Sequence, residues 1–326
     1  MHSLPFLCRA YDARAPHTLY KNVRRDLMRE NLFSGCGTAL ATPFKGNRVD
    51  YDCLEQMIDW QIESGADALI LLGTTGEPCT ITDSERSAMI ECAVARCAGQ
   101  IPLIVGTGSN CTETAKAYSR EAARMGADGV LVVAPYYNKS SDAGLIEHFR
   151  CIADCIEIPM ILYNVPSRTG YTLPTSVVSM LAEHPMIRGF KQADVSISAS
   201  MHLFNAVRGK MTLYCGNDDL ILPMMAMGAS GAISVAANII PQTIHNLTIG
   251  CIRGEIEASR DLQYAIEPLL QALSTCVNPI PIKAALSLMG KYENSMRAPL
   301  YPMAVDQMGQ LRAAMEELNL ISKKTA

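Results

Sequence analysis

The chain has 326 residues, of which 49% are hydrophobic and 18% are charged, a balance that supports a large buried core and excludes a disordered or fibrous protein. Lysine and arginine total 28 against 32 aspartate and glutamate, a formal net charge of -4, which argues against general electrostatic binding of nucleic acid or anionic lipid. The length fits two average domains or one α/β barrel with an added tail. We expect a globular protein that binds a small molecule, with no nucleic-acid partner and no membrane partner.

An N-terminal extension over residues 1–34 is the first predicted unit. Its first 27 residues are rich in lysine and arginine and follow neither a helical nor a strand period. Three interpretations stay open: Met28 is the natural start, the segment is a loose arm, or it is an organelle transit peptide, against which the scarcity of serine argues. No apolar stretch approaches the ~20 residues of a membrane helix, and the apolar run from Leu4 to Cys8 is too short for the core of a secretory signal. The expected location is the cytoplasm.

Residues 35–253 are predicted to form a barrel. Short apolar runs alternate there with amphipathic stretches, a rhythm that is typical of βα units and a parallel sheet. The amphipathic stretches carry helix-start signals, as at Asp83 and Thr112. Eight such units predict the α/β class and a closed (β/α)8 TIM barrel. The apolar runs begin near Thr38, Asp67, Pro102, Gly129, Pro159, Ile187, Thr212 and Gly231.

Residues 254–326 are predicted to form a C-terminal helical extension. Helical patterns lie near residues 254–276, 280–290 and 304–320, which is more than closing the barrel requires. Pro268 stands inside the first pattern, so a kink or a break is expected there. Because no linker precedes this segment, we expect it to pack on the barrel.

The cysteines and histidines do not indicate a metal centre or a disulfide framework. The 12 cysteines include no Cys-x-x-Cys pair, and the six histidines include no His-x-His or His-Glu-x-x-His spacing. Cysteines scattered within apolar runs are typical of reduced, buried thiols in a cytosolic protein. We therefore predict no metal site.

Lys191 lies near the end of the sixth apolar run, where a TIM barrel carries its active site. A charged lysine is costly to bury, whereas its neutral amine is the nucleophile that forms a Schiff base with a carbonyl. The alternative is a lysine whose amine reaches out to solvent. Other run ends hold Tyr163, a candidate proton shuttle, and Thr74 and Thr75, candidate donors to a carboxylate. Each has an ordinary structural interpretation, but one shared site explains their coincidence better.

Four longer motifs point to a family. They are Gly-Thr-Thr-Gly-Glu at 73–77, Pro-Tyr-Tyr-Asn at 135–138, Tyr-Asn-Val-Pro-Ser-Arg-Thr-Gly at 163–170 and Asn-Pro-Ile-Pro-Ile-Lys at 278–283. Together they resemble the dihydrodipicolinate synthases, also called 4-hydroxy-tetrahydrodipicolinate synthases, of the pyruvate-dependent class I aldolase and lyase superfamily. The resemblance implies condensation of pyruvate with aspartate semialdehyde in the diaminopimelate route to lysine. It implies neither a metal nor an organic cofactor, only a pyruvate imine on the protein.

The resemblance also implies catalytic roles. Lys191 would form the imine with pyruvate, and Tyr163 would shuttle protons during imine formation and cyclisation. Thr74 would link Tyr163 to Tyr137, which in this family reaches in from a neighbouring subunit. The active unit is then at least a dimer, and the family is commonly a homotetramer built as a dimer of dimers.

Substrate-binding roles follow from the same resemblance. Thr75 would help to bind the pyruvate carboxylate, and Gly216 and Ile233 are further substrate-binding positions. Arg168 would offer a planar fork to the carboxylate of the semialdehyde. Sialic acid lyases and sugar-acid aldolases of the superfamily lack the Ser-Arg-Thr-Gly pattern that contains this arginine.

The chain departs from the family pattern directly after Lys191. Where the family usually has Glu-Ala-Ser or Glu-Ala-Thr followed by Gly, this chain has Gln-Ala-Asp-Val-Ser at 192–196. Such a change affects the pocket of the second substrate rather than the imine step. Two alternatives therefore stay open: another pyruvate-dependent aldolase with a different aldehyde partner, and a barrel that only binds a keto acid.

Lysine-inhibited members of the family carry a feedback site at the subunit interface, and Asn110 and Tyr136 match its pattern. Asp83, Arg86 and Thr114 stand where those members tend to have His, His and Glu. Without an acidic group at position 114, the amine of a bound lysine lacks a counter-charge. We predict weak or absent inhibition by lysine.

Overall fold

The computed structural model describes residues 32–323 and contains a closed barrel of eight parallel strands. The strand order is β1-β10-β9-β8-β7-β6-β5-β4, and each strand lies at one of the eight apolar runs, so the predicted TIM barrel is confirmed. A short antiparallel ribbon of β2 (Phe44–Lys45) and β3 (Arg48–Val49) is additional to the prediction. The barrel strands are β1 (Gly35–Ala39), β4 (Ala68–Leu71), β5 (Leu103–Gly106), β6 (Gly129–Val133), β7 (Met160–Asn164), β8 (Ile187–Gln192), β9 (Thr212–Cys215) and β10 (Gly231–Ser234).

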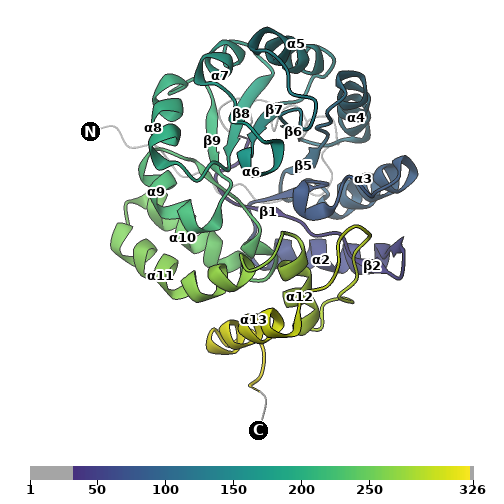
Figure 1. The fold of residues 1–326 in the computed structure, drawn as a ribbon, viewed down its shortest axis with the longest axis vertical. Coiled ribbons are helices and arrows are strands. Elements are labelled where there is room, and N and C mark those ends of the chain that lie inside the picture. The colour runs from purple at the N-terminus through teal and green to yellow at the C-terminus, as the bar shows by residue number, and fades with distance from the viewer. Residues whose placement is uncertain (1–31, 324–326) are drawn as a thin grey trace, which may run out of the picture.

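Helices surround the strands (Figure 1). α3 begins after Thr82 because the Thr82 hydroxyl accepts a hydrogen bond from the Glu85 backbone N–H, while the Glu85 carboxylate accepts one from the Thr82 N–H. The outer helices are α2 (Tyr51–Glu63), α3 (Asp83–Cys97), α4 (Thr112–Met125), α5 (Asp142–Ala153), α7 (Thr175–Leu181), α8 (Ile197–Ala206), α9 (Ile221–Ala226) and α10 (Pro241–Arg253). Short turns follow four strand ends: η1 (Thr74–Gly76), α6 (Pro166–Thr169), η2 (Asp218–Leu220) and η3 (Ala236–Asn238).

The barrel separates two apolar cores. The larger core lies between the strands and the helices, and a smaller one fills the interior of the barrel. At the end where the strands begin, Phe33 stacks on Tyr214 with ring centroids 4.3 Å apart, and the Tyr214 hydroxyl donates a hydrogen bond to the Phe33 carbonyl at 3.0 Å. This pair fills that end of the interior, which leaves the opposite end, where active sites of such barrels lie, for a ligand.

The C-terminal extension consists of α11 (Ile256–Leu273), α12 (Ile280–Leu288) and α13 (Val305–Glu317). α12 and α13 lie on one flank of the barrel (Figure 1). Of the kink or break expected at Pro268, the break does not occur, since α11 continues through this residue. Proline removes the hydrogen bond to the carbonyl four residues earlier, that of Tyr264, and Tyr264 lies on the exposed side of the helix, where it is 66% exposed.

Several further expectations concern the whole chain. Across residues 32–323, no helix is long and apolar enough to cross a membrane, and no three His, Cys, Asp or Glu side chains gather as a metal site. The described cysteines are free, and two of them, Cys79 and Cys111, are exposed rather than buried. The interpretations of residues 1–27 lie outside the described residues.

Candidate active site

Lys191 and Tyr163 lie side by side inside the barrel. They are register partners on β8 and β7, and partner positions on parallel strands point their side chains to the same face. The Lys191 Nζ atom lies 4.3 Å from the centroid of the Tyr163 ring. The two residues are only 5% and 6% exposed, so the amine does not reach out to solvent. The site therefore combines a buried amine with a phenol, the groups that imine formation and proton transfer require.

Gly216 leaves space for the Lys191 side chain. A Cβ atom at this glycine would lie 3.0 Å from Lys191 Cε and 2.8 Å from the Ala193 Cβ, too close for a packed interior to accept without movement. Ile233, on β10, is fully buried and belongs to the interior core. Gly216 thus borders the reactive lysine, and Ile233 contributes an apolar wall to the same interior.

The loop after β4 carries both predicted threonines. Thr74 opens η1, and Thr75 follows it with 1% exposure. The Thr75 hydroxyl accepts a hydrogen bond from Asn278 Nδ2 at 3.0 Å. Within residues 32–323, no hydrogen bond joins Thr74 to Tyr163. The single chain therefore positions Thr75 firmly but does not form the expected link through Thr74.

Tyr137 lies apart from the other candidate residues. It follows β6 in a loop, it is 94% exposed, and its φ of 67° lies in the left-handed region that non-glycine residues rarely adopt. Its side chain is therefore directed away from the interior of its own barrel. A large aromatic ring held outward by a strained backbone is available to a second molecule.

Arg168 lies at the open end of the barrel. It belongs to α6, directly after β7, and its side chain is exposed. Its Nη2 donates a hydrogen bond to the Asn278 backbone carbonyl at 2.8 Å. One edge of the guanidinium is thus fixed by the C-terminal extension, and the exposed remainder of the group is available to a carboxylate.

A buried ion pair fixes the same loop from the far end of the sequence. The Lys283 Nζ lies 2.5 Å from Glu77 Oε1, and both side chains are buried, with exposures of 0% and 1%. Burial lowers the pKa of Lys283 to about 8. Glu77 also accepts a hydrogen bond from the Arg297 backbone N–H at 3.2 Å. Glu77 has φ 55°, so these contacts hold a strained residue at the end of the threonine loop.

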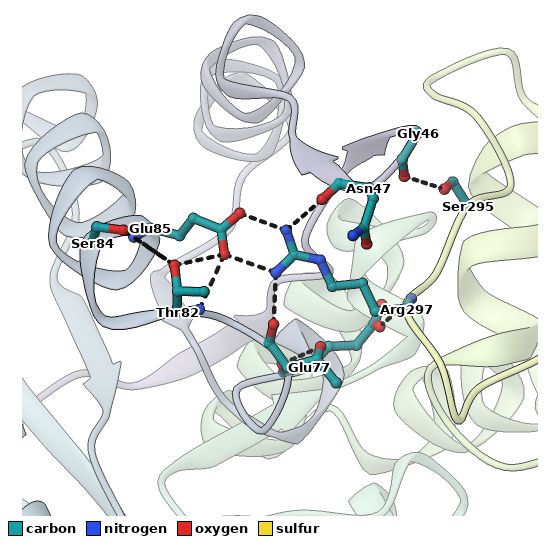
Figure 2. Close-up of polar contacts among 9 residues, drawn as sticks. Gly46, Asn47, Glu77, Thr82, Ser84, Glu85, Ser295 and Arg297 are labelled. Atoms are coloured by element: carbon teal, nitrogen blue, oxygen red, sulfur yellow. Dashed lines mark hydrogen bonds and ion pairs between the residues drawn. The ribbon is translucent and has the colours of Figure 1, made fainter.

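Arg297 extends this network to α3 (Figure 2). Its Nη2 lies 2.5 Å from Glu85 Oε1 and its Nη1 lies 2.7 Å from Glu85 Oε2, a two-pronged contact that lowers the pKa of Glu85 to about 2. Arg297 also donates to the backbone carbonyls of Thr80 and Asn47. Sequence reasoning missed these contacts. The motifs at 73–77 and 278–283 were visible, but nothing in a sequence says that they meet.

Asp218 is a second acidic group that the sequence did not single out. It opens η2 after β9, and its Oδ2 accepts hydrogen bonds from the backbone N–H groups of Val235 and Ala236 at 3.0 and 2.8 Å. Burial raises the pKa of its carboxyl group. These bonds tie the ends of β9 and β10 together, so Asp218 supports the side of the site that carries Gly216.

Comparisons with known proteins identify the family of this chain. The model of the dihydrodipicolinate synthetase family matches residues 32–318. The chain belongs to the dihydrodipicolinate synthetase family. It is 44% identical over 290 residues to a 4-hydroxy-tetrahydrodipicolinate synthase of Alkaliphilus oremlandii, covering 89% of this chain and 100% of that protein.

Solved structures in the dihydrodipicolinate synthetase family have the same fold. Dihydrodipicolinate synthase from Thermotoga maritima superposes with a TM-score of 0.88 at 36% identity, covering 89% of this chain and 100% of that one. DHDPS from Cyanidioschyzon merolae with lysine bound gives a TM-score of 0.86, also at 36% identity, and covers 89% and 99%. The family fold therefore accounts for nearly all of the described residues.

The departure from the dihydrodipicolinate synthetase pattern at Gln192 lies outside the barrel interior. Asn164 Nδ2 donates a hydrogen bond to Gln192 Oε1 at 2.8 Å, and Gln192 Nε2 donates to the Ser200 hydroxyl at 3.2 Å. These bonds connect β7, β8 and α8. Since Lys191 faces inward, the next residue along the strand faces outward. The amide thus belongs to a satisfied polar network behind the site rather than to a substrate pocket.

The residues at the family's feedback-site positions are bound by other residues of the same chain. The Arg86 guanidinium is buried, lies 4.0 Å from the Tyr118 ring centroid and donates to the Gly106 carbonyl at 3.0 Å. Tyr118 in turn donates to Asp83 Oδ1 at 2.8 Å. The Asn110 carbonyl accepts a hydrogen bond from Asn138. Burial raises the pKa of nearby Tyr136.

Proposed function

We propose that this protein catalyses the condensation of pyruvate with L-aspartate 4-semialdehyde to 4-hydroxy-tetrahydrodipicolinate through an imine on Lys191. The family match and the close relatives support the reaction. The observation that carries the residue-level proposal is the buried Lys191 amine 4.3 Å from the Tyr163 ring centroid. An interior closed at one end and lined by apolar side chains favours attack by a neutral amine and excludes competing water.

The chemistry starts at the Lys191 nitrogen. The neutral amine attacks the keto carbon of pyruvate, and loss of water gives the imine. Tyr163 relays the protons that leave nitrogen and reach the departing oxygen. Removal of a proton from the pyruvate methyl group then gives an enamine, whose carbon attacks the aldehyde. Finally, the amino group of the second substrate displaces Lys191 and closes the ring, which returns the free enzyme.

The two carboxylates take separate positions in this proposal. Thr75 binds the pyruvate carboxylate deep in the site, where Gly216 and Ile233 border the bound molecule. Arg168 binds the carboxylate of the semialdehyde at the open end. No metal or organic cofactor takes part in this proposal. The protonated imine accepts the electron pair that is left when the methyl proton is removed, and the resulting enamine supplies that pair to the new carbon–carbon bond.

Tyr137 acts in a neighbouring subunit in this proposal. Its 94% exposure and outward backbone geometry support a role outside its own barrel. Through Thr74 it would extend the proton path of Tyr163 to solvent, and the protein would be a homotetramer built as a dimer of dimers. We further propose a cytoplasmic location, which suits a chain with free cysteines.

Borohydride reduction in the presence of pyruvate tests the proposal. We expect a pyruvate adduct on Lys191 by intact mass and peptide mapping, no adduct in Lys191→Ala, and turnover of aspartate semialdehyde by the same preparation. The peptide with Lys283, a second buried lysine, is an internal control and should stay unmodified. An adduct without turnover would point to another aldehyde, and no adduct would point to a binding protein.

A further inference from the structure

Asn278 connects the two residues that are proposed to bind the two substrate carboxylates. It lies between α11 and α12, in the C-terminal extension. Its Nδ2 donates a hydrogen bond to the Thr75 hydroxyl at 3.0 Å, and its backbone carbonyl accepts one from Arg168 Nη2 at 2.8 Å. Thr75 and Arg168 belong to loops after different strands, so this one residue joins the deep and the open parts of the site.

The direction of the bond to Thr75 has a chemical consequence. A hydroxyl group has one proton to donate and two lone pairs to accept with. Because the Asn278 amide donates to the Thr75 oxygen, the Thr75 proton is not used in this contact. Among residues 32–323, no other group accepts it. The proton is therefore available for an anion, and a hydroxyl that already accepts a hydrogen bond is a stronger donor.

The segment that carries Asn278 is held firmly against the loop of Thr75. Two residues after Thr75, Glu77 forms its buried ion pair with Lys283, five residues after Asn278. Two side-chain contacts, one polar at Thr75 and one ionic at Glu77, thus join the loop to the extension. Such double attachment fixes the distance from Asn278 to Thr75 more closely than a single hydrogen bond would.

We propose that Asn278 is a positioning residue, whose side chain directs the Thr75 proton toward the pyruvate carboxylate and whose backbone carbonyl orients Arg168 toward the semialdehyde carboxylate. This inference rests on the proposed function. It predicts that a side-chain substitution at Asn278 affects the pyruvate KM and the semialdehyde KM differently, whereas a purely structural role would affect both. A side-chain substitution removes the bond to Thr75 but leaves the backbone carbonyl that Arg168 binds.

Two substitutions at this position test the direction of the bond. Asn278→Ala removes the hydrogen bond to the Thr75 hydroxyl, so that the Thr75 proton is no longer directed toward pyruvate. The pyruvate KM should therefore rise about tenfold, the effect of one hydrogen bond. In Asn278→Asp, which nearly preserves the size of the side chain, a carboxylate accepts the Thr75 proton and repels pyruvate, so the pyruvate KM should rise further. The semialdehyde KM of Asn278→Ala should change by less than about threefold, because the backbone bond remains.

The pH dependence gives a readout that a structural role would not move. Protonation turns the introduced carboxylate of the Asn278→Asp variant into a donor again, so its pyruvate affinity, measured by borohydride trapping against pyruvate concentration, should improve as the pH falls. The alanine variant has no such group and should not show this gain. A second control is the Thr75→Val background, which has no Thr75 proton. There the difference in pyruvate KM between Asn278→Asp and Asn278→Ala should shrink to the part that comes from direct repulsion of pyruvate by the carboxylate.

The outcomes separate this inference from the proposed function. Equal rises in both KM values for the two variants, or a loss of thermal stability without a change in pyruvate affinity, would overturn the role of Asn278 while the wild-type adduct on Lys191 remained. Failure of the wild-type protein to form that adduct would instead overturn the proposed function and this inference with it.

Discussion

A methyl group is enough to disturb the interior beside Lys191. Gly216 and the Lys191 Cε are so close that the site has no space for a larger residue. The position of the Lys191 amine depends on the absence of a side chain at Gly216, as well as on β8 and on the Tyr163 ring. Catalysis depends on such placement, since small shifts of a reacting atom lower rates strongly.

Gly216→Ala is therefore expected to lower kcat/KM for pyruvate by at least about tenfold, because the new Cβ displaces Lys191. Steady-state kinetics and borohydride trapping measure the effect. Gly309→Ala is the matched control, because a Cβ there meets no atom within 4 Å and alanine suits the interior of α13. Full activity in both variants would show that Lys191 has more freedom than its contacts suggest.

Arg168→Ala is expected to raise the KM for aspartate semialdehyde by about 10- to 100-fold, because a charge-assisted contact with a carboxylate is lost. The KM for pyruvate should change far less, since in the proposed function Thr75 binds that carboxylate. Arg168→Lys keeps the charge but loses the planar fork and should give an intermediate value. Equal rises for both substrates would contradict the assigned role.

The location of a single residue was predictable from the sequence when that residue lies at the end of a strand. Lys191 and Tyr163 end consecutive apolar runs, and consecutive strands of a parallel barrel are neighbours, so their proximity follows from the order of the chain. Asn278 and Lys283 were visible only as a motif. Their partners lie 203 and 206 residues away, and no local pattern indicates such contacts. The orientation of Gln192 follows from strand alternation once β8 is assigned.

Among the elements, the C-terminal extension does more than cover the barrel. It reaches the loop after β4 at Thr75 and at Glu77, and it reaches the start of α3 through Arg297 and Glu85. Figure 2 shows Arg297 between these two elements. The loop that carries Thr75, a proposed substrate-binding residue, thus takes its shape from a segment about 200 residues later in the chain.

Glu85→Gln tests the contact between α3 and the extension. The Arg297 guanidinium lowers the pKa of Glu85 from 4.5 to about 2. A lowered folded-state pKa stabilises the fold above pH 4.5, and this stability is lost as the pH falls toward 2. Glutamine keeps the cap on Thr82 but removes the charge. We expect a loss on the order of 2 kcal/mol in urea unfolding at pH 7, which shrinks below pH 4.5.

The control for this experiment is a comparison of the same variant at two pH values. A destabilisation of the same size at pH 7 and at pH 2.5 would contradict an ionic origin and would instead indicate lost packing. Arg297→Gln should show the same pH dependence as Glu85→Gln, because either substitution removes the same pair.

Elements were predictable where burial sets a period. Strands that are buried on both faces appear as continuous apolar runs, which is why all eight barrel strands could be located. The ribbon of β2 and β3 was not, since two-residue strands leave no pattern. A break at Pro268 was expected as one alternative and did not occur, because α11 packs on its neighbours along its length.

At the scale of the whole molecule, the exposed Tyr137 requires an explanation that one chain does not supply. If it completes the site of a neighbouring subunit, mixed oligomers of Lys191→Ala and Tyr137→Ala chains should regain activity. Each hybrid dimer then has one site with both residues intact, so a random mixture should reach about a quarter of wild-type activity. Separately assembled parents, mixed without exchange, are the control. Activity no higher than theirs would place Tyr137 outside the neighbouring site.

The proposed assembly also bears on inhibition by lysine, whose site in this family lies between subunits. Thr114 supplies no counter-charge for a lysine amine, and the buried Arg86 is occupied by Gly106 and Tyr118. We expect weak or absent inhibition when lysine is titrated into the coupled assay. Half-inhibition below ~0.1 mM, equivalent to an affinity of more than about 5 kcal/mol, would refute this. Thr114→Glu restores an acidic group and should not weaken whatever lysine binding exists.

The stacking of Phe33 on Tyr214 has a practical consequence for anyone who shortens this protein. Phe33 precedes the first strand, yet its ring and backbone complete the floor of the barrel. A trimmed version should therefore start no later than Leu32, because removal of the next residue would strip the buried Tyr214 hydroxyl of its partner and let water in from below. The shortest stable version of the chain is therefore defined by the pair of Phe33 and Tyr214 inside the barrel rather than by the first strand.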